Sequence, residues 1–314
     1  MSLRLSVLDQ SPIPQGQSIG DALRNTIELA RVADEAGYHR YWLAEHHSAA
    51  ALACSSPEVM IGPVASATQR MRVGSGGVML PHYSPLKVAE SFLMLAGLYP
   101  DRIDLGLGRA PGTTGRVARL LQRDRRTPPP DDFPDQLDEL LTYLKDSTLE
   151  PALLGSSQDS SIWAAERGLP YVFADFINPS GEPYTAFYRD RFQASPRLAE
   201  SRTSVCVWAI CAETDDEAMR LSMSARMMLL SLFRGRSIPV PTVLQAEEFL
   251  AQEGVPAWTL PGGRRLLTGA PQNLRRAIET VAFGYGAQEV FIVNILYDHE
   301  ARMKSYRLLA EAFL

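Results

Sequence analysis

Residues 72–107 of this chain read RVGSGGVMLPHYSPLKVAESFLMLAGLYPDRIDLGL, and they contain the unit that decides the fold. Arg72–Leu80 is rich in apolar and small residues and predicts a strand, and Ile103–Leu107 predicts a second one. Between them, Pro85–Leu98 opens on a proline and has the apolar pattern and length of a helix. Two strands joined by one helix form a βαβ unit, in which the strands are parallel.

The same alternation of strand and helix continues along the rest of the chain. Further strands are expected at Leu5–Leu8, Tyr41–Ala44, Ala152–Leu154, Tyr171–Ala174, Val205–Cys211 and Val290–Ile295. Helices are expected at Ser18–Ala36, Pro57–Thr68, Phe133–Lys145, the residues before Gly168, about 215–233 and 299–312. Eight strands, nearly all followed by a helix and without a break in composition, predict an α/β fold of the (β/α)8 or TIM-barrel class.

Two stretches lack the repeating pattern and are interpreted as insertions at the C-terminal rim of the barrel. A TIM barrel needs about 250 residues, so a chain of 314 residues has room for both. Ala110–Asp132 contains a run of three prolines, and Arg234–Ala270 is rich in proline and glycine with one short helix near 245–252. We therefore expect a single domain over residues 1–314, with a mobile insertion at about 234–270.

Composition and charge exclude several classes of protein. Hydrophobic residues make up 46% of the chain and charged residues 21%, which excludes a mainly disordered chain. The apolar runs are shorter than the roughly 18 residues of a membrane span, and the first residues are polar too soon for a signal peptide. A net charge of −5 argues against nucleic acid as a partner. Three cysteines without a CxxC pair indicate a reducing compartment, so we expect a cytoplasmic protein without disulfides or structural zinc.

The second predicted strand ends in Glu45-His46-His47, the first candidate for chemistry. Function in such a barrel lies at the C-terminal ends of the strands. Glu45 and His47 share a strand face and could bind a metal, but a metal site needs three or four ligands and no third suitable strand end is evident. Two interpretations remain. His46 acts as an acid, a base or a hydrogen-bonding group toward a ligand, or it is a histidine whose hydrogen bonds are made with the backbone. We expect no metal.

Glycines and an arginine follow the fourth predicted strand. Gly106–Arg109 matches a dinucleotide fingerprint poorly, because Pro111 interrupts any helix start and no acidic residue closes a following strand. Glycines here would instead let a flat ligand approach the barrel mouth. Arg109 then offers a guanidinium fork to an anionic group, or it is an ordinary surface arginine.

The segment after the fifth predicted strand, Gly155–Ser160, precedes a helix. Backbone N–H groups and hydroxyls at a helix N-terminus favour phosphate. A nucleophile elbow is not satisfied, because Asp159 replaces its second glycine. Simple helix capping by Ser157 or Ser160 is compatible with phosphate binding, so both interpretations stay open.

Taken together, four segments resemble one known family. They are YHRYWLAEHH at 38–47, VGSGGVMLP at 73–81, DRIDLGLGRAPG at 101–112 and LGSS at 154–157. In this order, and each at a strand end, they are similar to segments of the bacterial luciferase-like flavin monooxygenases, and most to the single-chain luciferase-like oxidoreductases. The resemblance runs from Leu3 to about Val207 and resumes from Thr268 to Phe313.

The resemblance implies a flavin barrel that uses reduced FMN and oxygen to oxidise a small organic substrate. It places His46 at the family's active-site histidine, beside the flavin ring. It also implies a non-proline cis peptide between Gly76 and Gly77 under the ring, where glycine lowers the steric cost of such a bond. Residues 234–270 take the place of the family's mobile active-site loop. The positions matched to cofactor binding are Gly76, Gly77, Arg109, Ser156, Ser157 and Ser160.

The resemblance also bears on partners. Reduced FMN is expected from a separate flavin reductase, because no NAD(P)H-binding segment is visible. Luciferase-like proteins resemble one another in pairing through helices near the first strands, so a homodimer is expected. The residues that could serve its two helical faces are Ala65, Ala67, Ala89, Leu93 and Ala96.

Three alternatives remain at this point. The first is a deazaflavin (F420)-dependent hydride transferase on the same barrel. The second is a barrel that binds flavin without turnover. The third, a phosphate-binding aldolase-type barrel, needs a catalytic lysine at a strand end, and none falls at the end of a predicted strand.

Overall fold

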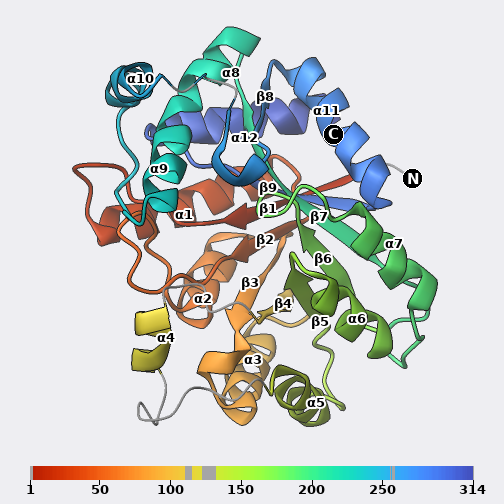
Figure 1. The fold of residues 1–314 in the computed structure, drawn as a ribbon. Coiled ribbons are helices and arrows are strands. Elements are labelled where there is room, and N and C mark those ends of the chain that lie inside the picture. The colour runs from red at the N-terminus through yellow and green to blue at the C-terminus, as the bar shows by residue number, and fades with distance from the viewer. Residues whose placement is uncertain (1–2, 110–114, 122–131, 255, 257–258, 314) are drawn as a thin grey trace.

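The computed structural model describes residues 3–109, 115–121, 132–254, 256 and 259–313. Eight parallel strands form a closed barrel, with helices around it (Figure 1). The pairings β1–β9 and β6–β7 close the barrel. Its strands are β1 (Arg4–Asp9), β2 (Arg40–Leu43), β3 (Arg72–Met79), β4 (Ile103–Gly108), β5 (Pro151–Gly155), β6 (Tyr171–Ala174), β7 (Thr203–Cys211) and β9 (Glu289–Val293). The predicted TIM barrel and its eight strands are confirmed.

One strand of the structure is not among those predicted. β8 (Leu267–Gly269) pairs with the end of β7, from Ala209 to Cys211, and lies outside the closed barrel. It falls inside the stretch that the sequence indicated as inserted. Three residues are too few for a period-2 pattern to be recognised, which explains why β8 escaped prediction.

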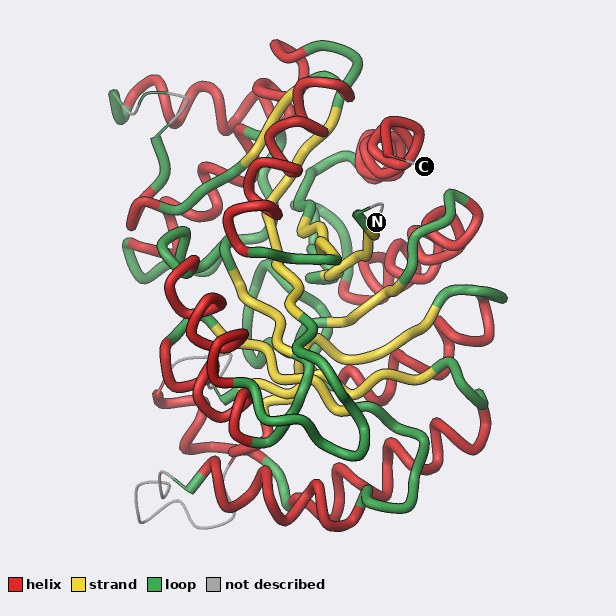
Figure 2. The backbone as a smooth tube through the Cα atoms, turned by 90° about the vertical axis from the view of Figure 1, so that its right-hand side faces the viewer, coloured by secondary structure: helices red, strands yellow, loops and turns green. Residues whose placement is uncertain are grey.

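The helices cover the outside of the barrel (Figure 2). Those expected from sequence are α1 (Ile19–Glu35), α2 (Pro57–Ala67), α3 (Pro85–Leu98), α5 (Phe133–Tyr143), α6 (Gln158–Glu166), α8 (Asp215–Leu221), α9 (Met223–Phe233), α10 (Val243–Gln252) and α12 (His299–Phe313). The helix expected at about 215–233 is thus divided at Ser222. The structure adds α4 (Gly115–Leu121), α7 (Glu182–Arg191) and α11 (Pro271–Tyr285). Most of the insertion expected at 110–132 lies outside the described residues. Among the described helices, none has the length and apolarity to cross a bilayer.

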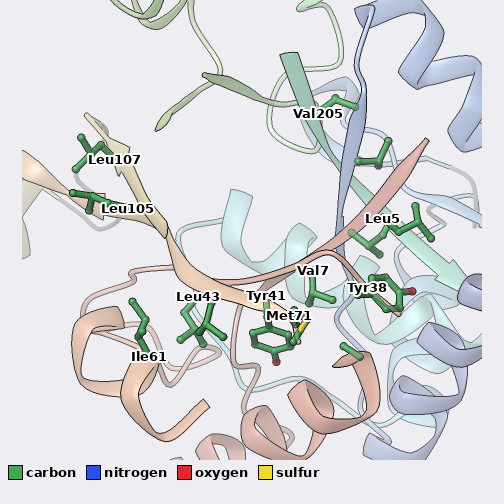
Figure 3. Packing of buried hydrophobic residues seen from close by; sticks show 14 of the residues in the cluster. Leu5, Val7, Tyr38, Tyr41, Leu43, Ile61, Met71, Leu105, Leu107 and Val205 are labelled. Atoms are coloured by element: carbon green, nitrogen blue, oxygen red, sulfur yellow. The ribbon is translucent and has the colours of Figure 1, made fainter. Parts of the chain in front are cut away.

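Successive side chains along each strand point alternately outward and into the barrel, and this divides the buried residues into two layers. Tyr41 and Leu43 of β2 face outward, where Leu43 and Ile61 of α2 belong to the same cluster between strands and helices (Figure 3). Trp42, between them, faces into the barrel and packs at a tilt against Phe291 of β9, with ring centroids 4.5 Å apart and ring planes at 38°. These two rings lie inside the barrel, in the cluster of buried residues that the strands enclose.

A buried ionic network occupies the N-terminal end of the barrel. Asp104 of β4 accepts hydrogen bonds from Arg40 at 2.6 Å and from the indole N–H of Trp42 at 2.9 Å. Arg40 also pairs with Glu289 of β9 at 3.2 Å. Burial raises the pKa of Asp104, but Arg40 and Arg72 outweigh it and hold the pKa below its usual value. The carboxylates of Asp104 and Glu289 thus pair with the buried Arg40 side chain at the end of the barrel opposite its mouth.

Candidate active site

A cavity of about 420 Å³ opens at the mouth of the barrel. Its walls come from the ends of several strands, from the segment that follows β2 and from α9. Most of the wall is apolar. The lining residues are Gln10, His46, His47, Ser48, Ala49, Ala51, Leu52, Phe176, Ile177, Trp208, Met228, Leu229, Leu232, Ser237, Ile238, Arg264, Val293 and Ile295. A mostly apolar cavity with a few polar groups, at the C-terminal ends of barrel strands, is the usual form of a cofactor or substrate site.

His46 lies in this wall with one ring nitrogen unpaired. Its backbone N–H donates to the carbonyl of Cys54 at 3.0 Å, which fixes the segment after β2. Although the residue as a whole is partly exposed, its Nδ1 is buried and has no hydrogen-bond partner. Burial, with a smaller contribution from His47, lowers the pKa of His46 to about 4. The imidazole is therefore neutral at physiological pH and can donate or accept a proton through hydrogen bonds to a ligand.

Trp208 of β7 supplies a second unpaired group in the same wall. Its indole N–H is buried and has no acceptor, and only 3% of the residue is exposed. A buried donor without an acceptor costs about 1–3 kcal/mol, so its presence in a cavity wall points to an acceptor on a bound ligand. The sequence did not single out Trp208, because its apolar neighbours in β7 made the whole strand read as core.

The contacts of Glu45 explain why a glutamate stands beside two histidines at the end of β2. The carboxylate is buried and accepts hydrogen bonds from the backbone N–H of Met79 at 3.0 Å and from the hydroxyl of Tyr83 at 2.9 Å. It also lies 2.7 Å from Nε2 of His47. Among the described residues, no group of three or more possible ligands could hold a metal ion. Glu45 thus ties the end of β2 to the end of β3 and fixes the shape of the mouth.

Gly76 and Gly77 lie in β3, where the peptide bond between them is cis, as predicted. The register of β3 on β4 shifts at this point, between Ser75 and Val78. A Cβ atom on Gly76 would lie 2.5 Å from a methyl carbon of Leu8, and one on Gly77 would lie 2.9 Å from the backbone of Gly106. Only glycine fits at position 77, where the contact is with backbone, whereas a larger residue at position 76 would force the Leu8 side chain to move. The irregular stretch brings the β3 backbone close to the neighbouring strands.

Arg109 follows β4 and lies over the start of α6. Its Nη1 is 2.8 Å from Oδ2 of Asp159, and its guanidinium lies 5.2 Å from the ring centre of Trp163. Both partners belong to α6. The structure therefore places Arg109 and Ser157 at the same end of the barrel, which is the arrangement that the sequence analysis required. The residues directly after Arg109, from 110 to 114, lie outside the described part of the chain.

The three serines at the end of β5 differ in what their polar groups do. Ser157 is the N-cap of α6, is exposed and makes no side-chain capping bond. The carbonyl of Ser156 accepts a hydrogen bond from the Asn178 side chain at 3.0 Å, which orients the N–H of Ser157 away from it. Ser160 is buried. Its hydroxyl donates to the Ser157 carbonyl at 2.7 Å and lies 2.9 Å from the Tyr171 hydroxyl. Ser160 thus supports the turn from beneath it.

Arg264 is a cation of the cavity wall that sequence analysis did not identify. It lies in the stretch expected to be inserted, directly before Arg265, which pairs with Asp175 at 3.0 Å. The guanidinium of Arg264 lies 5.3 Å from the ring centre of Phe233. Burial lowers its pKa, with no carboxylate contributing to the shift. No sequence motif marks this arginine, because it is brought to the mouth by the fold of a loop.

The buried imidazole of His46 predicts a pH dependence of stability. Its pKa is about 4 in the folded protein and near 6.5 in an unfolded chain. Between these values the unfolded state binds more protons, so stability falls as the pH falls through this window. Between pH 7 and pH 5, the wild type should lose about 2 kcal/mol more unfolding free energy than His46→Gln. Urea unfolding at both pH values measures the difference, and parallel losses in the two proteins would contradict it.

The closed barrel, its apolar mouth and the unpaired groups in the cavity wall together define a ligand-binding barrel. Residues 3–150 match the family model described as luciferase-like monooxygenase. The chain is 34% identical to the luciferase-like monooxygenase of Escherichia coli K12, over 98% of this chain and 96% of that protein. It is also 34% identical to the N-acetyl-S-alkylcysteine monooxygenase of Bacillus subtilis, over 99% and 98%. The crystal structure of apo-MsnO8 superimposes with a TM-score of 0.91 at 37% identity, covering 99% of this chain and 98% of that one.

The chain therefore belongs to the luciferase-like monooxygenase family and is an enzyme of that class. More distant structures share the fold alone. One is the FMN complex of the oxygenating constituent of 3,6-diketocamphane monooxygenase from Pseudomonas putida, with a TM-score of 0.74 at 19% identity. Another is an F420-dependent secondary alcohol dehydrogenase, with a TM-score of 0.70 at 15% identity.

Proposed function

We propose that the protein is an FMN-dependent monooxygenase that uses reduced FMN and O2 to oxidise a small organic substrate. The observation that carries the proposal is the pair of unpaired buried groups, His46 Nδ1 and Trp208 Nε1, in the wall of one apolar cavity at the mouth. A flavin ring offers both hydrogen-bond donors and acceptors along its edge and would pair them. When bound, reduced FMN supplies the two electrons with which O2 is activated to transfer one oxygen atom.

The residues near β4 and β5 suit the other end of the cofactor. The FMN phosphate is a dianion and needs charged or hydrogen-bonding partners. Arg109 would provide a charge-assisted fork, and the N–H groups that begin α6, with Ser156 and Ser157, would provide backbone and hydroxyl donors. Ser160 would act through the turn that it supports. Gly76 and Gly77 would leave room for the flat ring above β3.

The substrate would occupy the part of the cavity toward α9. Met228, Leu229 and Ile238 provide apolar contacts there, and Arg264 provides a cation. We propose an organic substrate with an apolar body and an anionic group near Arg264. The similarity to the N-acetyl-S-alkylcysteine monooxygenase supports this class, since that substrate carries an alkyl group and a carboxylate. Apolar walls would also exclude water from the reacting atoms.

The supply of reduced FMN would come from a separate flavin reductase in the cytoplasm. The phosphate position at the outer end of β5 is open to solvent, since Ser157 is exposed. The Arg109 side chain is 41% exposed as well. Both features suit a cofactor that enters and leaves during each cycle.

Cofactor binding and oxygen uptake test this function. We expect purified protein to bind FMN in preference to F420, as measured by the absorbance of each cofactor retained after gel filtration. With photoreduced FMN, we expect oxygen uptake to rise on addition of an N-acetyl-S-alkylcysteine, with an oxygenated product. Retention of F420 alone would favour the hydride transferase. Tight binding of oxidised FMN without substrate-dependent oxygen uptake would favour a non-catalytic flavin carrier.

A homodimer through α2 and α3 is a further part of the proposal. Of the residues that the sequence offered for this contact, Ala65 and Ala89 lie in the core and Leu93 is exposed. The same helices also expose other large apolar side chains, which a contact between two copies of the chain would cover. They are Val59, Leu86, Met94 and Leu98, with exposed fractions of 66%, 45%, 68% and 70%.

We therefore expect a dimeric mass in light scattering and a monomeric mass for the double variant Met94→Glu/Leu98→Glu, because two charges would be buried at the contact. Phe283→Glu is the matched control. Phe283 is 89% exposed on α11, away from this surface, and its replacement should leave the dimer intact. A monomeric wild type at micromolar concentration would contradict the proposal.

A further inference from the structure

Arg226 of α9 is a buried arginine whose charge is not neutralised. Only 4% of the residue is exposed. Its Nε donates to the hydroxyl of Ser222 at 2.8 Å, while Nη1 is buried without a hydrogen-bond partner. Buried arginines are normally paired with carboxylates, because an isolated charge in a protein interior is strongly destabilising. An unpaired buried guanidinium therefore calls for an explanation.

The acidic residues of the neighbouring helix do not supply the missing partner. Glu247 of α10 pairs with Arg220 at 3.0 Å, and Glu253, which follows α10, pairs with Arg234 at 2.5 Å. Within the described residues, no carboxylate lies in ion-pair distance of Arg226. Burial alone lowers the pKa of Arg226 to about 10, so the side chain is still charged at neutral pH.

Arg226 forms part of the wall of a cavity of about 250 Å³, separate from the candidate active site. Among the described residues, the two cavities have no lining residue in common. Apart from Arg226 and Thr259, the described wall residues are apolar: Leu230, Leu250, Pro256 and Pro261. The site therefore combines one unpaired cation with hydrocarbon surface, and it is several times larger than the roughly 30 Å³ that one water molecule occupies.

We propose that this cavity is a binding site for an organic monocarboxylate. The carboxylate would accept hydrogen bonds from the Arg226 guanidinium and neutralise its charge. The alkyl part would pack on Leu230, Leu250 and Pro261. An inorganic anion would satisfy the charge but leave the apolar wall unused, and a neutral alcohol would fill the apolar wall but leave the charge unpaired.

Calorimetric titration of the full chain carrying Arg264→Met with hexanoate tests this site, with 1-hexanol and sulfate as the comparison ligands at constant ionic strength. The Arg264→Met change removes the cation with which the candidate active site could bind a carboxylate, and the Arg226 and Arg234 variants are made in the same background. Hexanoate should bind at least about tenfold more tightly than either, because charge-assisted hydrogen bonds and apolar contact act together. Saturation with FMN should leave the hexanoate affinity unchanged, since the two cavities are separate. This control also makes the result independent of the proposed monooxygenase function.

Variants at Arg226 assign the binding to this side chain. Arg226→Met should abolish the preference for hexanoate over 1-hexanol and, without ligand, should unfold at a temperature no lower than the wild type, because it removes an unpaired buried charge. Arg226→Gln provides a second test if the Met variant folds poorly. Arg234→Met, a surface arginine at the end of the same helix, should bind hexanoate as the wild type does. The proposal would be overturned if hexanoate bound no more tightly than 1-hexanol or no more tightly than sulfate. It would also be overturned if hexanoate binding survived both Arg226 variants.

Discussion

Replacement of Arg109 by alanine should weaken FMN binding by about ten- to a hundredfold. Hydrogen bonds to a charged partner contribute about 1.5–3 kcal/mol, and about 1.4 kcal/mol corresponds to a tenfold change in affinity. Riboflavin lacks the phosphate, so it should bind the wild type poorly and be nearly indifferent to the substitution. Quenching of flavin fluorescence measures both ligands with both proteins.

Asp159, the ion-pair partner of Arg109, can be replaced in a second variant, for which the opposite effect on FMN affinity is expected. Asp159 lies in the first turn of α6, where its carboxylate would repel the FMN phosphate and compete for Arg109. Asp159→Asn should therefore bind FMN more tightly than the wild type and leave riboflavin unchanged. Arg31→Ala, on the exposed face of α1, controls for the loss of one positive charge and should change neither affinity. If Arg109→Ala weakens FMN and riboflavin equally, the arginine supports the protein structure and the phosphate position lies elsewhere.

Much of the fold could be predicted from sequence because its units are local. The helix predicted at Ser18–Ala36 is present as α1 with Ser18 as its N-cap, and Pro85–Leu98 forms a helix with the predicted bounds. α7 was missed because only Thr185 and Tyr188 of its residues are buried, which leaves a weak periodicity. α11 has a clear apolar face, including Leu274 and Ile278, and its pattern would have sufficed.

The candidate site was less predictable because its residues come from distant parts of the chain. Polar residues at strand ends, such as His46 and Arg109, stand out in sequence because they interrupt apolar strands. Trp208 does not stand out, since an aromatic residue in a buried strand is ordinary, and only the missing acceptor for its N–H marks it. Arg264 depends on the path of a loop that local patterns do not specify.

His46 is the residue whose replacement should separate catalysis from binding. Positioned acid–base groups contribute about 10²–10⁴-fold to rate, so His46→Ala and His46→Gln should lower substrate-dependent oxygen uptake by a factor in this range. FMN affinity should change little, because most of it would come from the phosphate site. Glutamine keeps a hydrogen-bonding group but cannot carry a proton between atoms, so equal losses in the two variants would indicate proton transfer at the imidazole.

A second histidine provides the matched control for that experiment. His39 precedes β2 at the opposite end of the barrel, and its Nε2 is also buried and unpaired. Burial lowers the pKa of both imidazoles. His39→Gln should therefore perturb folding in a similar way while leaving turnover intact, since His46 borders the cavity at the mouth and His39 does not. A comparable loss of oxygen uptake in both variants would show that the His46 effect is structural. Full activity in His46→Gln would instead exclude proton transfer at this imidazole and leave Trp208 as the polar group that orients the reacting atoms.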